Sequence, residues 1–323
     1  MLQSRFLTAT AFVLSLAAML DTGPASAKTP VVLDTDIGDD IDDIWALALL
    51  LRSPDLDVRL VTTTCGKAEY RAKIIARLLT VAGRTDIAVG LGEGGHAGTG
   101  GEQAWVEKYK LSDYPGKIHA DGAGAIIDLI ERSKDPVTVI AIGPLHTLAA
   151  ALDRRPSIAA KASLVGMYGS IRKGYDGKAP SPEYNVSANA TAARKVLSAP
   201  WRQITITPLD TCGMVNLSGK RFETMKESRD PLAQAVIENY RIWNNSKTTG
   251  TMHASSVLFD TAAIYLAYPG NRPLVKFETL SITVTPDGFT RIDPAGTKMT
   301  VATEWRDLDG FRDLLIERLC KPK

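Results

Sequence analysis

The sequence predicts an α/β fold, in which a mostly parallel central sheet carries helices on both faces and a small C-terminal layer adds a β-hairpin and a helix. The main observation is that short apolar, β-branched runs alternate with segments of helical periodicity along most of the chain. This alternation is typical of parallel sheets with right-handed crossovers. The second observation is a change after residue 274, where residues 277–284 alternate and a Pro-Asp-Gly turn leads into residues 290–292. There is no linker or repeat, so we expect this layer to flank a single domain.

The expected elements follow from these patterns in order. The first strand contains residues 31–33, and a buried helix covers residues 44–51 after an acidic stretch. Further strands are predicted at residues 57–64, 87–89, 136–142, 162–168, 203–207 and 301–305. Further helices are predicted at residues 68–82, 123–132, 190–197, 231–245, 255–268 and 308–319, with others starting near residues 146 and 219.

Composition excludes several classes of protein. The chain has 323 residues and a formal net charge of +2, so no strong electrostatic field favours nucleic acid as a partner. The three cysteines are widely separated, which predicts neither a disulfide framework nor a zinc site. We interpret them as small buried apolar residues.

Residues 1–27 have the pattern of a signal peptide. Arg5 precedes an apolar run over residues 6–20, and residues 25–27 (Ala-Ser-Ala) fit a cleavage site of small residues. A retained membrane anchor is the alternative, but the run is short and contains polar residues. We therefore expect one domain over residues 28–323, a periplasmic or secreted location, and no membrane contact after cleavage.

The chain is organised around an acidic stretch at the end of the first strand. Six aspartates lie within residues 34–43, and their mutual repulsion calls for a positive partner. A hard divalent cation suits them, and calcium is preferred over magnesium because it is less demanding about geometry. The alternative is that the later aspartates cap the following helix. Capping does not explain Asp34 and Asp36, because they end a strand, where open parallel sheets bind ligands.

The acidic stretch resembles the opening signature of the inosine-uridine-preferring nucleoside hydrolase family. It contains Asp-x-Asp-x-Gly over residues 34–38, followed by Asp42-Asp43 and an Ala/Leu-rich helix. Members of that family are calcium-dependent enzymes that cleave N-glycosidic bonds of ribonucleosides. In the usual signature one residue separates the glycine from the aspartate pair, whereas residues 39–41 intervene here. We align Asp42 and Asp43 with the pair because the helix then aligns, which leaves Asp40 as a possible substitute ligand.

Later segments extend the resemblance over residues 31–319. In the family, a Gly-Pro-Leu segment after a strand supplies a backbone carbonyl to the metal, and the matching carbonyl here is that of His146. Glu183 and Asn185 resemble the Glu and Asn of a Glu-Phe-Asn segment that hold ribose hydroxyls. Asp260 resembles a late aspartate that binds the metal.

The chain departs from the family at residues that would contact substrate. Lys67 stands where an Asn commonly touches the ribose, and Phe259 stands where many members have a His that protonates the leaving base. His119 lies beside an Asp-Gly pair, which in the family is found near the pocket. Because Phe259 cannot donate a proton, the base would be protonated by another group, such as His119, Tyr240 or His253, or would leave by stacking and a solvent path.

The resemblance implies hydrolysis of a ribonucleoside to ribose and free base. Asp36, Asp43, Asp260 and the His146 carbonyl would hold calcium, and Asp36 would activate the water that calcium orients. The residues expected to contact substrate are Asp42, Lys67, His119, Glu183, Asn185 and Phe259. The implied partners are a small nucleoside and further copies of the chain, in a dimer or tetramer.

Two other functions remain as alternatives. The first is an exported, calcium-stabilised nucleoside- or sugar-binding protein without turnover, which the departures at Phe259 and Lys67 favour and Asp36 opposes. The second is an Asp-x-Asp phosphatase, for which the sequence lacks a convincing lysine to neutralise phosphate.

Overall fold

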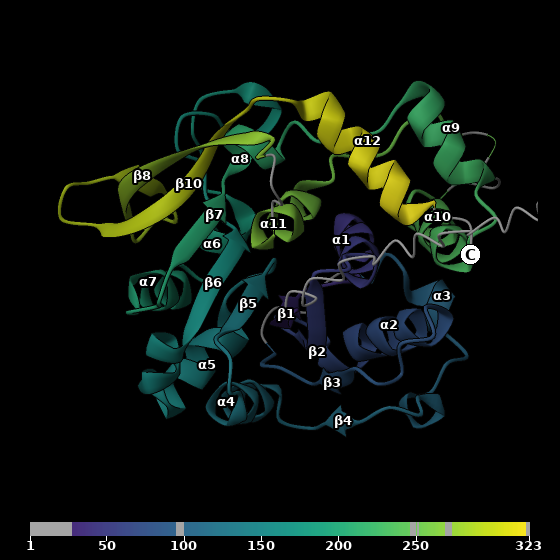
Figure 1. Ribbon diagram of the computed structural model, residues 1–323, viewed down its shortest axis with the longest axis horizontal. Helices are drawn as coiled ribbons and strands as arrows, with labels where there is room; N and C mark the ends of the chain where they lie inside the picture. Colours follow the sequence, from purple (N-terminus) through teal and green to yellow (C-terminus); the bar gives the residue numbers. More distant parts are fainter. Residues whose placement is uncertain (1–27, 95–99, 246–249, 251, 269–272, 321–323) are drawn as a thin grey trace, which may run out of the picture.

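The computed structural model describes residues 28–94, 100–245, 250, 252–268 and 273–320. These residues form a ten-stranded sheet with helices on both faces (Figure 1). The strand order is β4-β3-β2-β1-β5-β6-β7-β10-β8-β9. The expected signal peptide lies outside the described residues. Within the described part of the chain, no helix combines the length and the apolar character needed to cross a bilayer.

The parallel part of the sheet confirms the predicted alternation of strands and helices. Its strands are β1 (Thr29–Thr35), β2 (Leu56–Thr63), β3 (Ala88–Gly90), β4 (Ile118–His119), β5 (Val137–Ala141), β6 (Ala162–Met167) and β7 (Ile204–Thr207). β1 lies between β2 and β5 and runs parallel to both. Val31, Val32 and Leu33 are fully buried because both faces of β1 are covered, which explains the continuous apolar run.

Two hydrophobic clusters fill the space between the sheet and its helices. Val31 and Leu33 belong to one cluster and Val32 to the other, because successive strand residues point to opposite faces. On the first face lie α1 (Asp42–Leu51), α2 (Ala68–Val81), α9 (Gly219–Glu227), α10 (Pro231–Trp243), α11 (Phe259–Ala267) and α12 (Leu308–Leu319). On the second face lie α4 (Gly122–Arg132), α5 (His146–Arg154) and α7 (Ala190–Ser198).

The C-terminal strands continue the central sheet, whereas we expected them to form a separate flanking layer. The hairpin of β8 (Val275–Val284) and β9 (Thr290–Ile292) is present. β10 (Thr297–Trp305) begins earlier than predicted, pairs antiparallel with β8 and runs parallel to β7 (Figure 1). Met299 and Val301 of β10 are buried, so this strand extends the core instead of covering it.

The helix predicted over residues 255–268 begins later, at Phe259. The residues before it are held in a different way: the Ser255 backbone N–H donates to the Leu217 carbonyl at 2.8 Å, and that of Leu258 donates to the Val215 carbonyl at 2.7 Å. These bonds to a distant segment replace the intrahelical ones. They place Asp260 in the first turn of α11.

Candidate active site

The acidic stretch lies where the strand order changes direction. From β1 the sheet continues through β2 and β3 to β4 on one side, and through β5 and β6 to β7 on the other. In open α/β sheets, ligands bind beyond the carboxyl ends of the strands at such a point. β1 ends at Thr35 and α1 begins at Asp42, so residues 36–41 form the loop there. Gly38 in this loop has a φ of 111°, a conformation that favours glycine.

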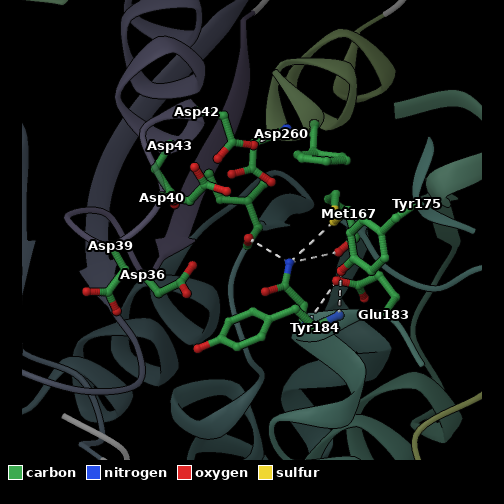
Figure 2. Close-up of a pocket in the computed structure, with 13 residues that line it drawn as sticks. Asp36, Asp39, Asp40, Asp42, Asp43, Met167, Tyr175, Glu183, Tyr184 and Asp260 are labelled. Atoms are coloured by element: carbon green, nitrogen blue, oxygen red, sulfur yellow. Dashed lines mark hydrogen bonds between the residues drawn. The ribbon is translucent and has the colours of Figure 1, made fainter. Parts of the chain in front are cut away.

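A cavity of about 230 Å³ opens at this loop. Its wall combines the loop and α1 with the ends of β5 and β6, the segment after β6, and the start of α11. Figure 2 shows the aspartates on one side and Met167, Tyr175, Glu183 and Tyr184 on the other. The predicted site residues that line the cavity are Asp36, Asp42, Asp43, Glu183, Asn185, Phe259 and Asp260.

Asp42, Asp43 and Asp260 form a compact group of carboxylates, called here the aspartate triad. Each offers one oxygen, and these oxygens lie within 4.8 Å of one another. All three side chains are buried, and the Asp260 backbone N–H donates to Asp42 Oδ2 at 3.1 Å. Burial raises the pKa of each carboxyl group well above its ordinary value, and repulsion among the aspartates raises it further. Three converging buried carboxylates that form no ion pair with a basic side chain of the described residues fit a hard divalent cation.

Asp36 lies beside the triad, against the backbone of Gly143. A Cβ atom added to Gly143 would lie 2.5 Å from Asp36 Oδ1, so the close approach of this carboxylate requires glycine. Burial raises the pKa of Asp36 from 3.8 to about 7, while the positive charge of Arg71 opposes the rise. Asp36 therefore lines the cavity beside the three converging carboxylates.

Glu183 and Asn185 are held against the ends of β5 and β6. Glu183 accepts the backbone N–H groups of Asn185 at 2.7 Å, Gly169 at 3.0 Å and Val186 at 3.3 Å. Burial nonetheless raises the pKa of Glu183 to about 7. Asn185 Nδ2 donates to the Ile142 carbonyl at 3.0 Å. These bonds fix both side chains without filling the cavity between them and the aspartates.

Arg71 of α2 is a buried cation behind the acidic loop that the sequence analysis missed. Its guanidinium donates to the Cys65 carbonyl at 2.6 Å, the Ile37 carbonyl at 2.8 Å and Asp39 Oδ2 at 2.7 Å. Asp39 Oδ1 accepts the Gly100 backbone N–H at 3.1 Å. Arg71 and Asp39 thus fix the loop in place. An arginine on a helix is normally exposed to solvent, so the sequence alone gave no indication of this role.

Three predicted site residues do not line the cavity. His119 is on β4, which β3 and β2 separate from β1, and it lines another cavity together with Arg59 and Asp128. Lys67 precedes α2 and lines a groove with Tyr70. Contact of His119 and Lys67 with the substrate stays a prediction.

His146 also lies apart from the cavity. It is the first residue of α5, and its backbone N–H donates to the Pro144 carbonyl at 2.9 Å. The backbone segment that lines the cavity is instead Ile142, directly after β5. The assignment of the His146 carbonyl as a metal ligand stays a prediction.

Asp40 lines the cavity without joining the triad. Its Oδ1 accepts the backbone N–H of Ile41 at 2.7 Å, within its own loop. The converging pair is Asp42 and Asp43, which agrees with the alignment we chose. Tyr175 and Tyr184 are further lining residues to which the sequence gave no role.

Comparison with known proteins supports one family. A sequence model described as "Inosine-uridine preferring nucleoside hydrolase" matches residues 31–312. A non-specific ribonucleoside hydrolase of Klebsiella pneumoniae is 28% identical over 257 residues, which cover 75% of this chain and 80% of that protein. One of Salmonella agona is 27% identical over 319 residues, covering 90% and 98%.

Solved structures share the fold. A plant nucleoside hydrolase superposes with a TM-score of 0.75 at 22% identity, covering 91% of this chain and 99% of its own. An inosine-uridine preferring nucleoside hydrolase from Bacillus anthracis gives a TM-score of 0.72 at 21% identity, covering 91% and 100%. Because the sequence match spans nearly the whole domain and includes the aspartate cavity, the chain belongs to the inosine-uridine preferring nucleoside hydrolase family of N-glycosyl hydrolases.

Proposed function

We propose that the protein hydrolyses the N-glycosidic bond of ribonucleosides to give ribose and free base, and that it requires calcium. The observation that carries this proposal is a single cavity in which buried aspartates face Glu183 (Figure 2), and Asn185 lines the same cavity. A sugar needs such groups, because each hydroxyl both donates and accepts hydrogen bonds. The ribonucleoside hydrolases among its relatives support the same substrate class.

The aspartate triad is the proposed calcium site. Asp42, Asp43 and Asp260 would hold the ion, with Asp36 at its edge. Among backbone groups, the His146 carbonyl is the further oxygen ligand that the resemblance implies, and Ile142, directly after β5, lines the cavity. When bound, calcium supplies positive charge that neutralises the carboxylates and lowers the pKa of water.

The side chains of the cavity have distinct proposed roles. Asp36 would accept the proton of the attacking water, since its carboxylate lines the cavity beside the triad. Glu183 and Asn185 would hold the sugar hydroxyls and so align C1′ for attack, which lowers the entropic part of the barrier. Asp42 would bind a hydroxyl as well as the ion. The remaining negative charge would stabilise the positive charge that develops on the ribose.

We further propose that the mature enzyme consists of residues 28–323, is periplasmic or secreted, and forms a homo-oligomer. The support for export is the pattern of residues 1–27, namely Arg5, an apolar run and a small-residue cleavage site. The support for assembly is the resemblance to the family alone.

The test is release of reducing sugar from inosine, uridine, cytidine and adenosine by residues 28–323, with calcium and with a chelator. Asp36→Asn is the active-site variant, and Asp121→Asn at the surface is the matched control. We expect calcium-dependent release in the wild type and in Asp121→Asn. In Asp36→Asn we expect a loss on the order of 100- to 10,000-fold, the usual contribution of a positioned base.

Two outcomes would contradict the proposal. If sugar were still released in the presence of the chelator and by Asp36→Asn, both the calcium requirement and the role of Asp36 as the base would be wrong. Absence of release from every nucleoside, together with calorimetric binding of one of them, would instead support the nucleoside-binding protein without turnover.

A further inference from the structure

Tyr175 and Phe259 form an aromatic end of the cavity. Tyr175 is the first residue of a short 3-10 turn, η3 (Tyr175–Gly177), and Phe259 is the first residue of α11. Their ring centroids are 6.1 Å apart and their planes meet at 82°, an edge-to-face arrangement. Both rings line the cavity that also holds Glu183 and Asn185. A ligand with a polyol part and a planar aromatic part therefore fits with its aromatic part at this end.

A backbone hydrogen bond orients the Tyr175 hydroxyl, and its own proton is available to a ligand. Its oxygen accepts the Tyr184 backbone N–H at 3.0 Å. No described group accepts its proton, and the residue is 36% exposed at the cavity mouth. Burial of the ring raises the pKa of Tyr175, so the hydroxyl is protonated at neutral pH and gives up its proton only as negative charge develops on the leaving base. The group is thus a fixed proton donor next to the aromatic end.

The other candidate donors are used elsewhere, lie outside the cavity or extend toward its aspartate side. Tyr240 donates to the Ala254 carbonyl at 3.1 Å, and no histidine of the described residues lines the cavity. The amide of Asn185 donates to the carbonyls of Ile142 and Met167. Figure 2 shows the side chain of Tyr184 extending toward the aspartate side, away from Tyr175.

We propose that Tyr175, packed against Phe259, donates its hydroxyl proton to the leaving nucleobase, and that this pair replaces a histidine acid. The inference rests on the proposed function. As the water oxygen bonds to C1′, the C1′–N bond breaks and its electron pair passes to the base. The base takes the proton of Tyr175, and the water proton passes to Asp36. Solvent at the exposed edge of Tyr175 then restores its proton, and Asp36 releases one.

The test compares two leaving groups in Tyr175→Phe. Inosine departs with a base that needs a proton, whereas 4-nitrophenyl riboside departs as a stable anion that needs none. We expect Tyr175→Phe to lower kcat on inosine by about 100-fold or more and to change kcat on the nitrophenyl riboside less than about threefold. Tyr268→Phe, a similarly exposed tyrosine outside the cavity at 41% exposure, is the matched control and should keep both rates. Melting curves check that each variant is folded.

Every outcome of this comparison bears on the proposal. Equal loss on both substrates in a folded variant would assign Tyr175 a structural role and overturn the inference. Unchanged hydrolysis of inosine would overturn it as well. If the wild type released sugar from neither substrate, the proposed function itself would fail, which is distinguishable because the wild-type rate is then zero.

Discussion

The carboxyl groups of the cavity and those of the surface are perturbed in opposite directions. At the surface, Asp121 accepts two hydrogen bonds from Arg154, both at 2.7 Å, and this pairing lowers the pKa of Asp121 to about 2. In the cavity, burial raises the pKa of Asp43 and Asp260 well above the ordinary value, and no described basic side chain pairs with them. The ionised form of an aspartate is therefore stabilised at the surface and destabilised in the cavity.

The difference indicates what each set of charges is for. The two charges of a surface ion pair neutralise each other, and the pair contributes little to the stability of the fold because water screens its attraction. Buried carboxylates that repel one another reduce stability until a ligand neutralises them. The cavity therefore carries charge that the fold alone does not require, which is the physical signature of a binding site.

Removal of a carboxylate from the aspartate triad should have the largest effect on the difference between the cavity and the surface. In wild type, calcium at 100 times its dissociation constant should stabilise the fold by about 2.7 kcal/mol. Asp260→Asn replaces one of the three converging carboxylates with a neutral amide, which removes a negative charge from the proposed calcium site, so we expect most of this stabilisation to disappear. Thermal melting with and without calcium measures it, with Asp121→Asn as the control that keeps the full shift. An equal shift in both variants would show that calcium binds elsewhere.

A second way to disturb the cavity is to displace Asp36 without changing its charge. In Gly143→Ala the new Cβ would lie 2.5 Å from Asp36 Oδ1, so the carboxylate must move. A displacement near 1 Å costs about 100-fold in rate, and we expect kcat to fall by that order. Gly94→Ala is the control, because its nearest neighbour would be 3.6 Å away. Full activity in Gly143→Ala would mean that the position of Asp36 is not critical.

The parts of this site that could be predicted are those fixed by local sequence. A β-branched run followed by aspartates predicted that ligand-binding residues lie at the end of a strand. Asp42 and Asp43 lie shortly after the end of β1 in the chain. The later match at Asp260 depended on the family resemblance, since no local pattern links it to α1. The fold class followed from periodicity in the same way.

The parts that could not be predicted depend on the arrangement of elements in space. His119 resembled a site residue, but it lies on β4 at the edge of the sheet, and β3 and β2 separate it from β1. Arg71 is buried because three acceptors surround its guanidinium, which no helical pattern reveals. Tyr175 lies in a loop without periodicity. Sequence order does not determine strand order, so these contacts needed the structure.

Glu102 sharpens the comparison, because it is buried like the triad but is not one of the converging carboxylates. Its side chain is inaccessible, and neither carboxylate oxygen has a hydrogen-bond partner. Burial raises the pKa of Glu102 well above 4.5, so the group destabilises the fold as pH rises above 4.5 toward that raised value. We expect Glu102→Gln to stabilise the protein at pH 7 by about 1 kcal/mol or more.

Denaturant unfolding as a function of pH measures the effect of Glu102→Gln. The difference between variant and wild type should be largest at neutral pH and should vanish below about pH 4.5, where Glu102 is protonated in both folded and unfolded chains. A variant that is less stable than wild type at pH 7 would mean that the glutamate has a cationic partner in solution.

The smallest expected effect comes from the surface pair itself. Asp121→Asn removes the charge that faces Arg154 but keeps a side-chain oxygen able to accept the Gly124 N–H at the start of α4, so only the ion pair is lost. The side chains of Asp121 and Arg154 are 56% and 48% exposed, and water screens their attraction, so the melting temperature should fall by no more than about 2 °C. Because pairing lowers the pKa of Asp121 to about 2, its contribution is present above pH 3.8 and is lost as the pH falls toward 2. High salt should reduce the difference further. A larger or salt-independent loss would show that this surface carboxylate, like those of the cavity, has a role beyond local pairing.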